Sequence, residues 1–126
     1  MAKILIIDDE ASACEFIKAS LEKRGYEIAV ALTGKDGLTA YPRENPDLVL
    51  LDLGLPDMNG REILKEIKEK MPKIKVMVIS AYKAQSTRDE LVKLGADYFM
   101  GKPFAIPKLC EAVQEILKPC PLESEL

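Results

Sequence analysis

The chain has 126 residues, 48% of them hydrophobic and 31% charged, which is the composition of an ordinary globular protein with one domain. The net charge is −3, and basic and acidic residues are interspersed, which argues against a surface for direct nucleic-acid binding. No apolar run is long enough to cross a membrane, and the apolar stretch at the start is too short for a signal peptide. We therefore expect a cytoplasmic protein.

Short, continuously apolar runs at residues 4–7, 28–31 and 48–51 predict strands that are buried on both faces. Between the first two, Ser12-x-x-Glu15 is typical of a capping box at the start of a helix. Helical spacing then continues on one face, and Gly25 ends this first helix. The residues on that face are Ala13, Phe16, Ile17, Ser20 and Leu21. Thr33 starts a second helix, which Pro42 should keep short.

The second half of the chain continues the same alternation. A helix follows Gly60, then come a strand at residues 76–79, a more polar helix ending at Gly95 and a strand at residues 98–100. A last helix has Pro107 in its first turn and an apolar face that ends at Leu117. Five strands alternating with five helices predict an α/β fold with a doubly wound parallel sheet.

The chain has three cysteines, which are Cys14, Cys110 and Cys120, and it has no histidine. Their scattered spacing argues against a structural zinc site, and the lack of histidine argues against histidine-based acid–base chemistry. An odd number of separated cysteines fits a reducing compartment. We expect Cys14 and Cys110 to be buried on helical faces and Cys120 to be an exposed thiol in the tail.

Polar residues stand where the predicted strands end. They are Asp8 and Asp9 after the first strand, Asp52 after the third, Ser80 after the fourth and Lys102 after the fifth. In a doubly wound sheet these ends lie along one edge, where such folds bind ligands. Two carboxylates about 4 Å apart repel by roughly 4 kcal/mol at an effective dielectric of 20, so the cluster needs cations. Lys102 supplies one positive charge, and an all-oxygen ligand set favours Mg²⁺ or Mn²⁺ for the rest.

A carboxylate, a divalent ion, a lysine and a hydroxyl together suit phosphoryl transfer. In this interpretation Asp52 attacks phosphorus to form an acyl phosphate, and Lys102 neutralises the phosphoryl oxygens. Ser80 then donates a hydrogen bond to a phosphoryl oxygen. Taken alone, each residue has a plainer role as a helix cap, a turn residue or a solvated charge. Their position at successive strand ends favours the functional interpretation.

Four motifs, in this order, carry a resemblance to a known family: ILIIDDE, LVLLDLGLPDMNG, VISAY and GADYFMGKPF. Over about residues 3–117 the chain resembles the receiver domains of two-component response regulators. The resemblance implies a flavodoxin-like sheet of five strands in the order 2-1-3-4-5. It implies a receiver domain at residues 1–118 and a C-terminal tail, or the start of a linker, at residues 119–126. It also implies a phosphoacceptor switch that is not an enzyme, although it assists its own phosphorylation and dephosphorylation.

The resemblance assigns roles residue by residue. Asp52 is the phosphoacceptor, Asp8 and Asp9 are the acid pocket, and Gly54 offers its backbone carbonyl to the metal; Ser80 is the switch hydroxyl, Phe99 the switch aromatic and Lys102 the phosphate partner. The family also implies a cis bond before Pro103. Three positions depart from the family pattern. Phe99 stands where tyrosine is common, Pro42 falls where the family's second helix usually continues, and Ala105 replaces a frequent helix-capping acid.

The resemblance also implies partners. A sensor histidine kinase or a phosphotransfer protein would supply the phosphoryl group. The face made by the fourth helix, the fifth strand and the fifth helix would then bind a downstream effector or a second copy of the chain. Tyr82, two residues after the switch hydroxyl, is expected either to shield the acyl phosphate from water or to belong to a docking surface.

Two other classes of protein fit parts of this pattern. A phosphatase with an aspartyl-phosphate intermediate usually has a second Asp two residues after its nucleophile, where this chain has Gly54. A flavodoxin-like module that binds a cofactor needs a phosphate loop after its first strand, where the acidic Asp8 and Asp9 would repel an anion unless a metal intervened. Labelling with acetyl phosphate and Mg²⁺, followed by intact-mass measurement, distinguishes these classes.

Overall fold

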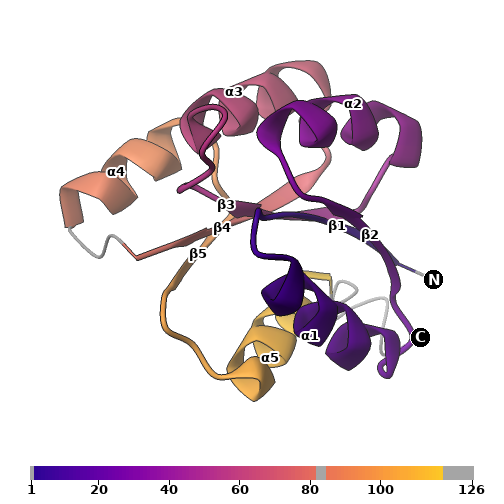
Figure 1. Cartoon of the computed structure of the whole chain (residues 1–126). Helices are drawn as coiled ribbons and strands as arrows, with labels where there is room; N and C mark the ends of the chain where they lie inside the picture. The colour runs from indigo at the N-terminus through magenta and orange to yellow at the C-terminus, as the bar shows by residue number, and fades with distance from the viewer. Residues whose placement is uncertain (1, 82–84, 118–126) are drawn as a thin grey trace, which may run out of the picture.

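The computed structural model describes residues 2–81 and 85–117, in which strands and helices alternate strictly (Figure 1). The strands are β1 (Lys3–Ile7), β2 (Glu27–Ala31), β3 (Leu48–Asp52), β4 (Lys75–Ser80) and β5 (Tyr98–Gly101). The helices are α1 (Ala11–Glu22), α2 (Gly34–Glu44), α3 (Gly60–Lys70), α4 (Gln85–Lys93) and α5 (Ile106–Leu117). The predictions for Tyr82, for Cys120 and for the tail at residues 119–126 concern residues outside these ranges.

The five strands form one parallel sheet in the order β2-β1-β3-β4-β5, as predicted. Side chains alternate between two cores along each central strand. Leu5, Ile7, Val49, Leu51, Val76 and Val78 belong to one core, and Ile4, Ile6, Leu48, Leu50, Met77 and Ile79 to the other. Helices α2, α3 and α4 cover the first face of the sheet, and α1 and α5 cover the second (Figure 1). Continuous apolar runs are required because both faces are buried.

Helix α1 begins earlier than the capping-box pattern predicts. It starts at Ala11 with Glu10 at the N-cap, so the prediction of a box at Ser12 and Glu15 is wrong. The cause lies just before the helix, where the Asp8 carboxylate accepts a hydrogen bond from the Glu10 N–H at 3.0 Å. This bond turns the chain into helix before Ser12 is reached.

The buried face of α1 also differs from the predicted one. Cys14, Ile17 and Leu21 are buried, whereas Phe16 is 71% exposed, so its assignment to the core face is wrong. Helical spacing alone allows two neighbouring stripes on α1, and packing against the sheet decides between them. The burial of Cys14 and Cys110 is as predicted.

Helix α2 contains Pro42 and continues to Glu44, so the prediction of a short second helix is wrong. Pro42 stands in the last turn, where its missing N–H costs one hydrogen bond. The turn still closes, because the Asn45 N–H bonds the Tyr41 carbonyl at 3.0 Å and Asn45 adopts a left-handed conformation. At the other end Thr33 is the N-cap, as predicted, and its hydroxyl oxygen accepts from the Asp36 N–H.

The second half of the chain follows the predictions closely. Gly95 has a positive φ of 104° just after α4, and the Lys102–Pro103 bond is cis. At the start of α5, the Ala105 carbonyl accepts the N–H groups of Lys108 and Leu109, both at 3.1 Å. None of the described helices is long and apolar enough to cross a membrane.

Candidate functional site

The carboxyl edge of the sheet gathers the predicted site residues. Asp8 follows β1, Asp52 ends β3 and Ser80 ends β4. Within the described residues, these three are the only polar or charged side chains that are buried. Asp9 is exposed, yet it offers an oxygen to the same cluster: one carboxylate oxygen each of Asp8, Asp9 and Asp52 lies within 4.8 Å of the other two.

Both carboxylate oxygens of Asp52 have polar contacts. Its Oδ1 accepts a hydrogen bond from the Gly54 N–H at 3.0 Å, and its Oδ2 lies 3.3 Å from the Lys102 Nζ. The same ammonium is 3.9 Å from Oδ2 of Asp8. Burial lowers the pKa of Lys102, but the negative charges of Asp52 and Asp8 outweigh that effect and raise the pKa overall. Lys102 is therefore a fixed positive charge at neutral pH.

Burial and neighbouring charges both act on the Asp8 carboxyl group. Burial raises the pKa of its carboxyl group, and the negative charge of Asp52 raises it further, while the hydrogen bond from the Glu10 N–H opposes them. Three carboxylates face one ammonium here, so a fully ionised cluster carries an excess of negative charge. All its donors are oxygens, the ligands that hard cations prefer. The cluster therefore suits a divalent metal ion.

Cys14 lies beneath the cluster and was not predicted to contact it. Its Sγ donates a weak hydrogen bond to the Asp8 carbonyl at 3.5 Å. Burial, followed by the charges of Asp8 and Asp9, raises the pKa of the Cys14 thiol to about 11. Without a bound metal, Cys14 is therefore a neutral thiol at physiological pH.

Phe99 stands apart from the acid cluster, on the edge strand β5. It is half-buried, and it pairs with Val78 of β4, two residues before Ser80. The Arg88 guanidinium of α4 lies 4.8 Å from the centre of the Phe99 ring, a cation–π contact. The sequence analysis did not identify Arg88, because a contact between a helix residue and a strand residue eleven positions later has no local pattern.

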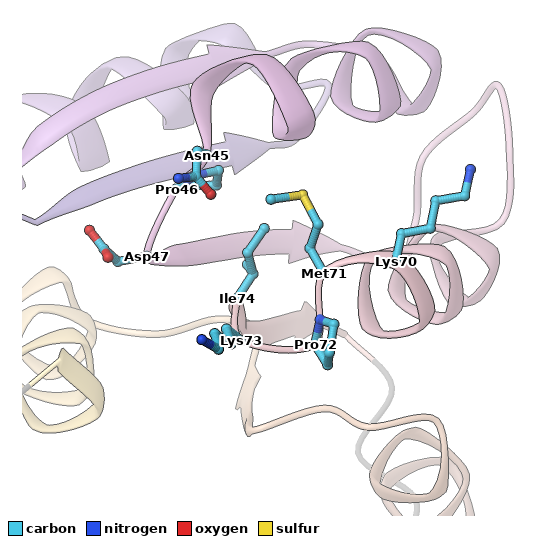
Figure 2. Close-up of a pocket in the computed structure, with 8 residues that line it drawn as sticks. All are labelled: Asn45, Pro46, Asp47, Lys70, Met71, Pro72, Lys73 and Ile74. Carbon is cyan, nitrogen blue, oxygen red and sulfur yellow. The ribbon is translucent and has the colours of Figure 1, made fainter.

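A pocket of about 460 Å³ opens at the opposite, amino edge of the sheet. Figure 2 shows its lining, which comes from the α2–β3 and α3–β4 loops: Asn45, Pro46, Asp47, Lys70, Met71, Pro72, Lys73 and Ile74. The Asp47 carboxylate already accepts the Lys3 N–H at 2.8 Å, and Lys70 pairs with Glu66 at 3.8 Å. Because Asp47 and Lys70 already have partners, we place the candidate functional site at the carboxyl edge.

Comparison with known proteins agrees with this geometry. A family model of the response regulator receiver domain matches residues 4–114. The chain is 36% identical over 117 residues to the chemotaxis protein CheY of Thermotoga maritima, covering 92% of this chain and 98% of that protein. It is 38% identical over 122 residues to the sporulation initiation phosphotransferase F of Bacillus subtilis, covering 97% and 96%. Several other relatives are longer proteins, of which the chain spans about half or about a quarter.

A solved structure shows the same likeness in three dimensions. The response regulator protein TrrA of Thermotoga maritima, in complex with Mg²⁺ and BeF, matches this fold with a TM-score of 0.82. It is 35% identical in sequence, and the match covers 93% of this chain and 100% of that one. Sequence and structure thus point to one family over nearly the whole length of the chain.

Proposed function

The chain belongs to the response regulator receiver domains, the phosphoacceptor signalling switches of two-component systems, and we propose that Asp52 is its phosphoacceptor. The observation that supports this role is the contact of Oδ2 of Asp52 with the Lys102 ammonium at 3.3 Å, inside a cluster of three acids. Response regulators interact with kinases or phosphotransfer proteins and with effectors. For this chain, the donor would be the phosphohistidine of a cytoplasmic sensor histidine kinase or phosphotransfer protein.

The proposed reaction transfers one phosphoryl group. An oxygen of Asp52 forms a bond to phosphorus as the bond between phosphorus and the imidazole nitrogen of the donor breaks. The imidazole leaves as a neutral group when its other ring nitrogen carries a proton. Lys102 compensates the charge on the phosphoryl oxygens, and Ser80 then donates its hydroxyl hydrogen to one of them. The chain itself is a signalling domain, and these residues only assist the gain and loss of the group.

We assign the divalent metal site to Asp8, Asp9 and Asp52 together with the backbone carbonyl of Gly54, and we propose Mg²⁺, with Mn²⁺ as the alternative. The all-oxygen donor set supports this assignment. A bound ion would supply positive charge that offsets both the excess of carboxylates and the incoming phosphoryl group. Asp8 and Asp52 are held in place by backbone N–H groups, so their oxygens are oriented before an ion binds.

The signal would leave the site through Ser80 and Phe99. Phosphorylation adds nearly two negative charges beside Ser80 and Lys102. We propose that Ser80 moves toward the phosphoryl group and that the Phe99 ring turns inward, away from Arg88. That movement would change the face made by α4, β5 and α5, to which an effector or a second copy would bind.

The test is labelling by acetyl phosphate in the presence of Mg²⁺, followed by intact-mass measurement. The wild-type protein should gain the mass of one phosphoryl group, and Asp52→Asn should gain none. Asp36→Asn, which changes an exposed carboxyl group of α2, is the matched control and should label normally. Undiminished labelling of Asp52→Asn would contradict the assignment. In the same samples, beryllofluoride should shift the NMR signals of α4, and shifts confined to the surroundings of Asp52 would contradict the switch.

A further inference from the structure

The loop that follows the proposed phosphoacceptor, residues 53–59, is fastened to another part of the fold. Asp57 in this loop accepts hydrogen bonds from the first two amides of α2: its Oδ1 from the Gly34 N–H at 2.9 Å and its Oδ2 from the Lys35 N–H at 3.0 Å. The first amides of a helix have no partner within the helix, and its N-terminus favours negative charge. These two bonds hold the pKa of Asp57 below its ordinary value, so its carboxylate is ionised at neutral pH.

Steric contacts hold the same loop on both sides. A Cβ added to Gly34 would lie only 2.4 Å from Cγ of Met58, so the loop presses directly on the start of α2. A Cβ on Gly60 would lie 2.9 Å from the Cα of Leu53, so the start of α3 packs on the backbone that leaves β3. The loop is therefore enclosed between two helix N-termini.

This loop carries a backbone group that orients the proposed phosphoacceptor. The Gly54 N–H donates to Oδ1 of Asp52 at 3.0 Å, which leaves Oδ2 facing Lys102. Gly54 is exposed and has no side chain, so it makes no side-chain contact of its own that could hold its peptide group. The orientation of that peptide must come from its neighbours in the loop. Within the described residues, the side-chain hydrogen bonds between this loop and α2 are those accepted by Asp57.

We propose that Asp57 is a positioning residue for the phosphoacceptor site. Its carboxylate fastens residues 53–59 to the first turn of α2 and thereby holds the Gly54 peptide against Asp52. This inference rests on the proposed function, because it takes Asp52 and the Gly54 carbonyl as parts of the site. Without Asp57, the Gly54 peptide would sample other orientations, and both metal binding and labelling would weaken.

The competing explanation is that Asp57 stabilises α2 and does nothing else. Thr33 provides a matched control, because its hydroxyl oxygen accepts from the Asp36 N–H at 3.0 Å at the same helix terminus. Thr33→Ala and Asp57→Ala both remove a cap from α2. Only Asp57→Ala also frees the loop that carries Gly54.

The experiment measures three quantities for the wild type, Asp57→Ala and Thr33→Ala. They are the affinity for Mn²⁺, followed by the electron paramagnetic resonance of the free ion, the rate of labelling by acetyl phosphate, and the melting temperature. The chain has no tryptophan, so a metal-based signal replaces fluorescence. We expect both variants to melt earlier. Asp57→Ala should bind Mn²⁺ about tenfold more weakly and label more slowly, while Thr33→Ala keeps wild-type values.

Equal Mn²⁺ affinities for Asp57→Ala and Thr33→Ala would overturn the inference. If Asp57→Ala does not fold, Asp57→Asn replaces it, since the amide retains one acceptor oxygen and loses the charge. The Mn²⁺ affinity of Asp57→Asn should then be reduced relative to the wild type but not abolished. A wild-type protein that binds Mn²⁺ but takes no phosphoryl group would contradict the proposed function. The Mn²⁺ comparison would still decide the role of Asp57 in that case.

Discussion

The two edges of the sheet differ in how their carboxylates are balanced by positive charges and hydrogen-bond donors. At the carboxyl edge, Asp8 and Asp52 share the ammonium of Lys102, and Asp9 adds a third carboxylate to the same cluster. At the amino edge several ammonium groups and backbone N–H donors serve the carboxylates. The Lys3 ammonium at the start of β1 lies 2.5 Å from Glu44 at the end of α2 and 3.5 Å from Glu27 at the start of β2.

Asp97, just before β5, completes the pattern at the amino edge. Its Oδ2 accepts from the Lys68 Nζ at 2.6 Å and from the Val76 N–H at 2.9 Å. Lys68 also donates to the Ile74 carbonyl at 2.7 Å, so three segments of chain meet in one satisfied network. Such a network stabilises the fold and leaves no capacity for a ligand.

The two edges differ in the electrostatic cost of keeping their carboxylates ionised. Buried like charges destabilise a fold, and they persist where a ligand will compensate them. A search for cavities alone would point away from the acid cluster, because the pocket of about 460 Å³ lies at the amino edge. We therefore take the excess of carboxylates, and not the pocket, as the mark of the candidate site.

The largest expected effect is on labelling, and it comes from a variant that relieves the charge excess at the carboxyl edge. Asp8→Asn keeps an oxygen for the Glu10 N–H but removes a buried negative charge next to Asp52. Without metal, the free energy of unfolding of the variant should therefore exceed that of the wild type by about 1 kcal/mol. Its labelling by acetyl phosphate should fall by about 10- to 100-fold, because a proposed metal ligand is lost.

Two measurements check the effect of Asp8→Asn. Chemical denaturation in the presence of a chelator gives the free energy of unfolding, and intact-mass kinetics give the labelling rate. Added Mg²⁺ should stabilise the wild type more than the variant. A variant that is less stable than the wild type without metal would refute the contrast between the two edges.

The next effect is the converse change at the amino edge. Asp97→Ala leaves the Val76 N–H without its acceptor and the Lys68 ammonium without its carboxylate. The free energy of unfolding should fall by about 2 kcal/mol, since a buried donor loses its partner. The rate of labelling by acetyl phosphate should not change, because the network lies at the other end of the sheet.

Lys75→Ala is the matched control for Asp97→Ala. Its Nζ lies 4.0 Å from Oδ1 of Asp97, and its side chain is 52% exposed. An exposed pair of this kind contributes little, so this variant should remain close to the wild type in stability. A similar loss in both variants, or slower labelling of Asp97→Ala, would contradict the separation of the two edges.

The sequence predicts the sheet and the acid cluster for the same reason. Each strand is a local apolar run, and Asp8, Asp52 and Ser80 directly follow such runs, as Asp52 follows residues 48–51. Parallel topology then brings all these ends to one edge without any knowledge of side-chain packing. Both features therefore follow from patterns a few residues long.

The features that escaped prediction depend on contacts between distant residues. Helical spacing marks Phe16 as apolar, but only the packing of α1 shows that it is exposed. The bonds from Asp57 join positions more than twenty residues apart, and nothing near Asp57 predicts them. Pro42 is the opposite case. Its local pattern predicts a short helix, but α2 continues past it because the lost hydrogen bond falls in the last turn.

The smallest expected effect tests the pairing of Lys3 with Glu44 at the amino edge. The hydrogen bond from Lys3, followed by that from Arg43, lowers the pKa of Glu44 from its ordinary value of 4.5. A carboxyl group with a lowered pKa in the folded state adds stability above its unfolded pKa and loses it as the pH falls through the folded pKa. Glu44→Gln should therefore melt slightly earlier than the wild type at pH 7, by less than Asp97→Ala does. The difference should vanish well below pH 4.5, where Glu44 is protonated in both states.

Melting temperatures measured from pH 7 to pH 3 check this, with the exposed Glu69→Gln as control. A gap between wild type and Glu44→Gln that stays constant with pH would show that the amino edge does not depend on this ion pair.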